Sequence, residues 1–285
     1  MSTAIRPLRR AAVAGTWYPG QADELTVEVD GYLDAVEEMP TRDVVAIIAP
    51  HAGLIYSGPV AAYAYRALQR RTFDVAVLVG PSHFVGFDGV SIVPRGGFAT
   101  PLGPAVVDAA VADRIRAGSE KITPYPRAHE REHSLELQLP FVRRVLPDTP
   151  IVPLVMGYQE RDTIIDLADA LADGLAGTRA LLIASTDLSH YFDADRAAVL
   201  DGRVVDHVSR FDWAGLLEEF EQHPESDRGR YVACGGGPAI AVMRAAAALG
   251  ATSARVLKRA DSGDVSGDKT RVVGYLAAVF DRGGA

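Results

Sequence analysis

The 285-residue sequence is poor in cysteine, contains no long apolar run and has no excess of basic residues. Its single cysteine, Cys234, cannot form an internal disulfide, so it acts either as a thiolate or as a small apolar side chain. No apolar stretch approaches the length that spans a bilayer. The apolar run at 11–14 is too short for the core of a signal peptide. We therefore expect a cytoplasmic protein that has no membrane partner.

The charge balance is acidic, with 29 Lys and Arg residues against 37 Asp and Glu residues and a net charge of -8. Such a chain gives no general electrostatic reason to bind nucleic acid. Hydrophobic residues make up 48% of the sequence and charged residues 23%, which is ordinary for a globular protein. No Gly-, Ser- or Pro-rich linker divides the chain, so we expect residues 1–285 to form a single domain.

Strand-like and helix-like patterns alternate along the chain, which indicates an α/β fold with a largely parallel central sheet flanked by helices. Pro153 lies inside one of the expected strands and favours an edge position for it. The expected strands are 44–49, 74–79, 90–93, 151–155, 181–185, 254–259 and 271–280. The expected helices are 21–38, 57–68, 105–116, 134–146, 161–175, 194–208, 212–221 and one that follows Pro238.

Three of these apolar strands are each followed, within a few residues, by a histidine. Because the carboxyl ends of parallel strands lie along one edge of a sheet, these side chains are expected to converge there. Imidazole is the commonest side-chain metal ligand, and it also transfers protons near neutral pH. A single loop histidine is more often satisfied by a backbone carbonyl, but the repetition favours a shared site. The three histidines are His51, His83 and His190.

Cys234 precedes three glycines and Pro238, which suits the first turn of the helix expected next. A helix N-terminus lowers the pKa of a nearby thiol and favours the thiolate. Cys234 is therefore the natural partner of the histidines in a metal site. A small buried residue on a tight turn is the alternative interpretation.

Asp187 and His190 stand three residues apart in a short segment that follows the third of these strands. If Leu188 begins a helical turn, Asp187 caps it and His190 faces the same side. His190 then acts as a general base that the carboxylate orients. A plain capping turn explains Asp187 equally well but leaves His190 unexplained.

The segment 129–133 reads His-Glu-Arg-Glu-His and matches the zinc-protease pattern H-E-x-x-H. Prolines lie just upstream and the segment is highly charged, which opposes a buried metal-binding helix. We expect a loop here, with no zinc held jointly by His129 and His133. Glu136 in the next helix is expected on a solvated face, with the crevice as the alternative. Trp17 and Tyr18 are candidates for the crevice mouth, with core packing as the alternative, and the acidic turn-rich loop 261–268 is a candidate for its rim.

Taken together, these segments resemble the Memo family, known in prokaryotes as AmmeMemoRadiSam system protein B. The resemblance covers almost the whole chain in order. It rests on AGTWYP at 14–19, APHAG at 49–53, GPSH at 80–83, EHSLELQLPF at 132–141, STDLSH at 185–190, CGGGP at 234–238 and SGDVSGD at 262–268.

The resemblance implies a fold similar to that of the class III extradiol dioxygenases, which cleave catechol rings with ferrous iron. It implies that His51, His83 and Cys234 are the metal ligands, that His190 is the base and that Asp187 lies beside it. The ring-cleaving enzymes use two histidines and a carboxylate. Here Cys234 replaces that carboxylate with a soft thiolate, so copper and zinc join iron as candidate cofactors, and the fold by itself does not establish the reaction.

Two functions follow as hypotheses from the residues and the resemblance. In the first, the protein is a metal-dependent redox enzyme of dioxygenase-like architecture that acts on an unidentified small or modified substrate, with iron or copper as its cofactor. In the second, it is a non-catalytic metal-holding or peptide-binding protein whose partners are radical-SAM and AMMECR-like proteins. Oxygen consumption that depends on the metal distinguishes the two.

Overall fold

The computed structural model describes residues 8–38 and 43–283. Its main feature is a nine-stranded sheet with the strand order β10-β12-β2-β9-β3-β8-β4-β7, in which β11 pairs with β12 outside this path. The strands of this sheet are β2 (Asp43–Ala49), β3 (Val75–Pro81), β4 (Val90–Ile92), β7 (Ile122–Thr123), β8 (Ile151–Met156), β9 (Ala180–Ser185), β10 (His190–Phe192), β11 (Ser253–Asp261) and β12 (Val272–Arg282). A small second sheet has the order β1-β5-β6, formed by β1 (Leu8–Arg9), β5 (Gly97–Phe98) and β6 (Ala105–Val106).

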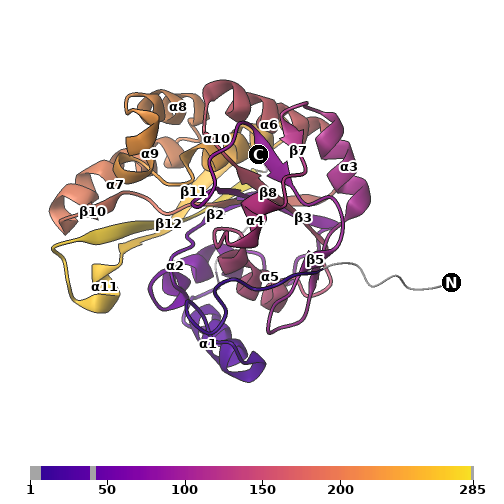
Figure 1. Ribbon diagram of the computed structural model, residues 1–285. Helices are drawn as coiled ribbons and strands as arrows, with labels where there is room; N and C mark the ends of the chain where they lie inside the picture. Colours follow the sequence, from indigo (N-terminus) through magenta and orange to yellow (C-terminus); the bar gives the residue numbers. More distant parts are fainter. Residues whose placement is uncertain (1–7, 39–42, 284–285) are drawn as a thin grey trace.

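Helices cover both faces of the central sheet (Figure 1). In this view α1, α2 and α5 lie below the sheet, and α3, α6, α8 and α10 lie above it. The helices are α1 (Ala22–Asp34), α2 (Leu54–Arg66), α3 (Ala109–Ala117), α4 (Arg127–Glu130), α5 (Leu139–Val145), α6 (Arg161–Gly174), α7 (Ala194–Ser209), α8 (Trp213–Glu221), α9 (Glu225–Tyr231), α10 (Gly236–Ala248) and α11 (Gly263–Ser266), with the 3-10 turn η1 (Glu136–Gln138) before α5. None of the helices in the described part of the chain has the length and apolarity needed to cross a membrane.

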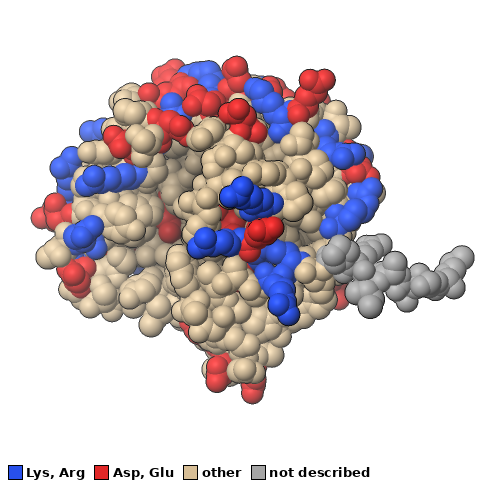
Figure 2. Space-filling model, viewed as in Figure 1, with Lys and Arg blue, Asp and Glu red and all other residues tan. Residues whose placement is uncertain are grey.

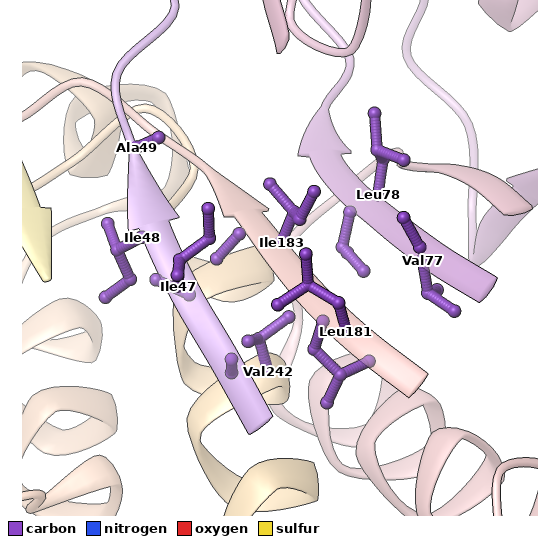
Figure 3. Close-up of a cluster of buried hydrophobic side chains, with 14 of the residues drawn as sticks. Ile47, Ile48, Ala49, Val77, Leu78, Leu181, Ile183 and Val242 are labelled. Atoms are coloured by element: carbon purple, nitrogen blue, oxygen red, sulfur yellow. The ribbon is translucent and has the colours of Figure 1, made fainter. Parts of the chain in front are cut away.

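The centre of the sheet is parallel, as predicted for a largely parallel sheet, but the outer strands make the sheet mixed. Strand β12 pairs antiparallel with β2, β10 and β11, and β4 pairs antiparallel with β8. Strand β9 pairs in parallel with β2 on one side and β3 on the other, and β3 pairs in parallel with β8. Figure 3 shows β2, β9 and β3 running in the same direction, with Val242 of α10 packed against them. Their residues are almost entirely buried, because helices cover both faces. The predicted α/β class is therefore confirmed, and the carboxyl ends of β2, β9 and β3 lie at one edge.

The edge position predicted for the strand containing Pro153 is wrong, because β8 lies between β3 and β4. The reason is local. The pairing of β4 with β8 ends at Ile92 opposite Leu154, and the Pro153 carbonyl accepts a hydrogen bond from Val93 beyond that end. The proline nitrogen faces the same side, so the reciprocal N–H bond to Val93 cannot form and the β4–β8 ladder ends at this point.

Other elements also differ from those expected: the sequence patterns do not predict the small second sheet, β7, α4 or α9, and the helix expected over 134–146 begins only at Leu139, after η1. Helix α3 begins at Ala109 rather than near 105, because the Asp108 carboxylate caps it by accepting the amides of Ala110 and Val111. Residues 105–106 instead form β6. The helical turn expected at Leu188 is absent, since β9 is followed by an irregular segment and then by β10, which starts at His190.

Candidate metal centre

Three predicted ligands meet at the carboxyl edge of the parallel strands. His51 follows β2 by two residues, His83 follows β3 by two residues, and Cys234 immediately precedes the α10 cap. One ligand atom from each lies within 4.8 Å of the other two. Cys234 Sγ is 3.2 Å from His51 Nε2. These three side chains form a candidate metal-binding group.

Both histidines are held so that one ring nitrogen remains available to a metal. The Nδ1 atom of His51 lies 2.9 Å from Ser185 Oγ, and Nδ1 of His83 lies 2.8 Å from Glu132 Oε1. Metal-binding histidines typically have one ring nitrogen fixed in this way by a carboxylate or hydroxyl. In both residues Nε2 is left as the ligand atom. The donor set therefore fits a transition metal.

The surroundings of Cys234 favour the ionised thiolate form of its side chain. Burial alone raises its pKa, but the charge of His51, together with hydrogen bonds to His51 and His83, lowers that pKa to about 6. The amide of Asp187 also points to Sγ at 3.4 Å. A thiolate is the form that binds metals, so Cys234 is ready to act as a ligand at neutral pH.

Glu132 positions His83, a role that the sequence analysis missed. Its two carboxylate oxygens accept the His83 amide at 2.6 Å, the His83 ring at 2.8 Å, and the amides of His133 and Ser134 at 3.0 and 2.9 Å. Burial raises the pKa of Glu132, but its hydrogen bonds with His83 lower that pKa to about 2. His83, Glu132 and His133 form a second cluster of potential ligands. Because both oxygens are already occupied, this carboxylate orients a ligand rather than serving as one.

The H-E-x-x-H segment does not form one helix, since α4 ends at Glu130, between the two histidines. His129 donates to or accepts from Ser91 Oγ at 3.0 Å, whereas the His133 ring stacks 4.5 Å from His83 and lines the cavity described below. Burial, followed by the charges of His51 and His83, lowers the pKa of His133 to about 3 and keeps the ring neutral.

The segment is expected to be a loop because its charge opposes a buried helix, but its first part forms the short helix α4 and some of its side chains are buried despite their charge. His129, Glu132 and His133 are all buried. Burial of Glu132 is tolerated because hydrogen bonds fill its carboxylate, and Arg9 donates to the backbone carbonyls of His129 and Glu132. By contrast, Nδ1 of His129 and Nδ1 of His133 are buried without a hydrogen-bond partner in the described part of the chain.

The two predicted catalytic residues, Asp187 and His190, lie beside the ligands. A third cluster joins both of them to Cys234 within 4.8 Å. Asp187 Oδ1 accepts the His51 amide at 2.7 Å, and burial raises the pKa of this carboxyl. Within residues 8–38 and 43–283, the hydrogen-bond partner of the His190 ring is the Leu188 carbonyl, 2.7 Å from Nδ1, and not Asp187. Asp187 thus holds the His51 backbone instead of capping a helical turn.

The candidate metal centre lies in a cavity of about 920 Å³. The cavity opens on the face shown in Figure 2, in the hollow between the part that carries β10 and α11 and the central part. Trp17 lines it, with its ring 4.4 Å from that of His133, and the loop residues Ser262, Ser266 and Asp268 form part of its wall. Trp17 and the loop 261–268 therefore lie where expected, whereas Tyr18 is buried in the core and does not line the cavity.

Glu136 is neither solvated nor in the cavity, contrary to both expectations. It is fully buried and accepts hydrogen bonds from the Arg9 guanidinium, the amides of Ala12 and Val13, and the Tyr18 hydroxyl. This carboxylate therefore fastens the N-terminal segment that carries Trp17. Ser185, the hydroxyl partner of His51, was also missed, although its position as the last residue of an apolar strand at the predicted edge was a usable signal.

Comparison with known proteins agrees with the motif resemblance. Residues 9–279 match the family described as Memo-like protein. MEMO1 family proteins of Methanosarcina mazei and Thermotoga petrophila are 37% and 35% identical to this chain, over 96% and 95% of it and 99% of each relative. An uncharacterized protein of Escherichia coli K12, known from a crystal structure, aligns with a TM-score of 0.47 at 14% identity and covers 82% of this chain and 99% of its own. On the family match and the similarity to these MEMO1 family proteins, this chain belongs to the Memo family.

Proposed function

We propose that the protein is a metal-dependent redox enzyme that binds iron or copper through His51, His83 and Cys234. One observation carries the proposal. Two imidazoles with their Nδ1 atoms tethered, and a thiol of lowered pKa, converge in a cavity large enough for a small organic ligand. A bound iron or copper ion supplies electron exchange with a substrate. A thiolate with two imidazoles suits copper(I) and ferrous iron, with zinc as the non-redox competitor.

His190 supplies proton transfer in this proposal. Its Nδ1–H donates to the Leu188 carbonyl, which fixes the neutral tautomer and leaves Nε2 as an acceptor. His190 lines the same cavity as His51 and Cys234. Nε2 therefore removes a proton from a substrate hydroxyl that enters the cavity, and returns it to the product. Asp187 maintains the site by holding the His51 backbone.

The competing function is a non-catalytic metal-holding protein that binds a partner or peptide, with radical-SAM and AMMECR-like proteins as the candidate partners. The observation in its favour is the aromatic mouth of the cavity. Trp17, Tyr56 and Tyr191 line the cavity while 40%, 39% and 56% exposed. Exposed aromatic side chains are common anchors in protein and peptide recognition.

Oxygen consumption tests the enzyme proposal. The protein is purified anaerobically, its metal content is measured, and samples loaded with ferrous iron, copper(I) or zinc are exposed to oxygen with catechol or ascorbate as reducing probes. We expect consumption with iron or copper but not with zinc, and a loss of at least tenfold in His190→Ala with the metal retained. Equal consumption by the parent and by metal-free His51→Ala would contradict an enzymatic role. Tight metal binding without consumption for any probe would favour the metal-holding alternative.

A further inference from the structure

Two arginines face the cavity without an acidic partner. Arg230 lies on α9 and Arg271 directly precedes β12, and both line the cavity that contains His51 and Cys234. Within the described ranges, neither guanidinium takes part in a hydrogen bond or an ion pair. Other surface arginines do have carboxylate partners, as Arg95 and Arg144 do with Asp113 and Asp30. The free N–H donors of Arg230 and Arg271 are therefore available to a ligand.

Aromatic rings hold both guanidinium groups in place. Arg271 lies over the Tyr191 ring at 5.3 Å, and Arg230 lies over the rings of Phe192 and Tyr231 at 4.9 and 5.8 Å. A guanidinium stacked by its face keeps its N–H groups free at the edge. Less conformational entropy is then lost when those groups bind a planar or tetrahedral oxyanion.

Strand β10 is irregular at Tyr191, a residue that lines the cavity. Tyr191 has a φ of 65°, in the left-handed region that side chains other than glycine rarely adopt. The register of β10 against β12 shifts at the same place. Tyr191 is 56% exposed and lines the cavity next to His190. Strained backbone of this kind is concentrated at functional sites, and here it presents the ring on which Arg271 stacks.

The acidic residues of the cavity do not neutralise these arginines. Asp187 is buried and holds the His51 amide. Asp268 accepts the amide and hydroxyl of Thr270, at 2.8 and 2.6 Å, through one oxygen. The hydroxyl oxygen of Ser266, also in the wall, accepts the Asp268 amide, which leaves its own hydrogen free to donate. This part of the wall therefore offers positive charge and hydrogen-bond donors in a protein whose net charge is -8.

We propose that Arg230 and Arg271 form an anion-binding subsite of the metal cavity, so that the ligand of this protein is a small organic anion with a carboxylate or phosphate group. The anionic group lies against the two arginines, and the rest of the molecule extends toward His51, His83 and Cys234. This inference deepens the proposed function, because it names the chemical class of the ligand of that same site.

Matched neutral and anionic probes test the subsite. The affinities of benzoate, of its neutral analogue benzamide and of inorganic phosphate are measured by titration calorimetry with metal-free protein at low salt. We expect benzoate or phosphate to bind at least tenfold more tightly than benzamide. Arg230→Gln and Arg271→Gln should each weaken the anion at least tenfold, and the double variant should abolish the preference. Preference for phosphate points to a phosphate ester, and preference for benzoate to a carboxylate.

Arg196→Gln is the matched control. Arg196 stacks over the same Phe192 ring at 4.5 Å but does not line the cavity, so its removal should leave anion affinity within twofold of the parent. Equal binding of benzoate, benzamide and phosphate by the correctly folded parent would overturn the proposal, as would an equal loss in Arg196→Gln. Because the probes are tested without metal, a failure of metal loading or of oxygen consumption leaves this result standing. Iron and copper affinities of the two arginine variants should equal those of the parent.

Discussion

At the scale of single residues, the contact between Cys234 and His51 controls the chemistry of the site. A thiol buried among apolar groups is normally inert, because burial opposes its ionisation. Here His51 and His83 outweigh that effect and bring the pKa of the thiol to about 6. The same contacts bring three soft or borderline donor atoms within 4.8 Å of one another. The contacts of Cys234 with His51 and His83 therefore favour both ionisation of the thiol and a donor cluster suited to a metal.

The Cys234→Ser variant tests whether Cys234 is a metal ligand or only a turn residue. The exchange is nearly isosteric, so we expect normal folding, but a neutral hydroxyl is a far poorer donor to soft ions than a thiolate. Affinity for copper(I) and ferrous iron, measured anaerobically by competition with a chelator, should fall at least a hundredfold. His190→Ala should keep most of the metal, and His51→Ala serves as the metal-free control. Unchanged affinity in the serine variant would leave Cys234 as a turn residue only.

His129 makes stability depend on pH. Burial, reinforced by the charge of Arg9, lowers its pKa to about 4, against about 6.5 in an unfolded chain. Between these values the unfolded state binds the proton and the folded state does not. Stability due to this group is therefore complete above pH 6.5 and falls as the pH drops toward 4. The loss amounts to roughly 3 kcal/mol over that window.

His129→Gln should remove this pH dependence while keeping a polar contact with Ser91. The free energy of unfolding, measured in urea at pH 7.0, 5.5 and 4.5, should fall less steeply in the variant than in the parent. Parallel pH curves would mean that His129 titrates normally in the folded protein. His223→Gln, which changes a histidine outside this buried network, controls for the loss of one imidazole.

At the scale of elements, the N-terminal segment is fastened to η1 by one carboxylate. Glu136 receives donors from Arg9, Ala12, Val13 and Tyr18, and this brings Trp17 against His133. The Glu136 side chain is fully buried and that of Arg9 is only 10% exposed. Removing either charge of such a buried pair strongly destabilises the fold, because the other charge is then buried without a partner.

Glu136→Gln should leave the Arg9 charge without compensation. We expect a loss of about 3–5 kcal/mol in the free energy of unfolding, measured by urea denaturation. In a Trp213→Phe background, the fluorescence of Trp17 should shift as the segment loosens. Glu130→Gln, on the exposed side of α4, is the matched control and should leave both signals unchanged. A Glu136 variant as stable as its parent would show that the backbone contacts alone fix the segment.

At the scale of the whole molecule, the central parallel strands form a rigid base for the site. The buried core of β2, β9 and β3 continues into α10, as Leu181 and Val242 illustrate in Figure 3. The candidate metal ligands are attached to the ends of these same elements. A close-packed interior transmits small changes in volume to stability.

Leu181→Ala should therefore affect stability and not the intrinsic affinity of the site. Leu181 is fully buried near the start of β9, and its truncation should cost about 2–5 kcal/mol. The exposed Val199→Ala, by contrast, should change stability by less than about 0.5 kcal/mol. Metal affinity of the folded Leu181 variant should match that of the parent. A large loss of affinity would mean that core packing shapes the ligand geometry directly.

The sequence by itself determined the features that depend on neighbouring residues. Apolar runs identified β2, β3 and β9, and the strand-end rule placed His51 and His83 at one edge, since parallel strands share that edge. The glycines and Pro238 located Cys234 before α10 for a similar local reason. These patterns need no knowledge of distant contacts.

Tertiary structure alone decided which groups meet around those ligands. Glu132 contacts His83 across 49 residues, Ser185 contacts His51 across 134, and Cys234 reaches His51 across 183. The carboxylates of Glu132 and Glu136 looked solvated in a charged or amphipathic context, yet both are buried because backbone amides and arginine donors satisfy them. Whether a polar side chain is buried depends on donors brought in by folding, and local sequence does not contain that information.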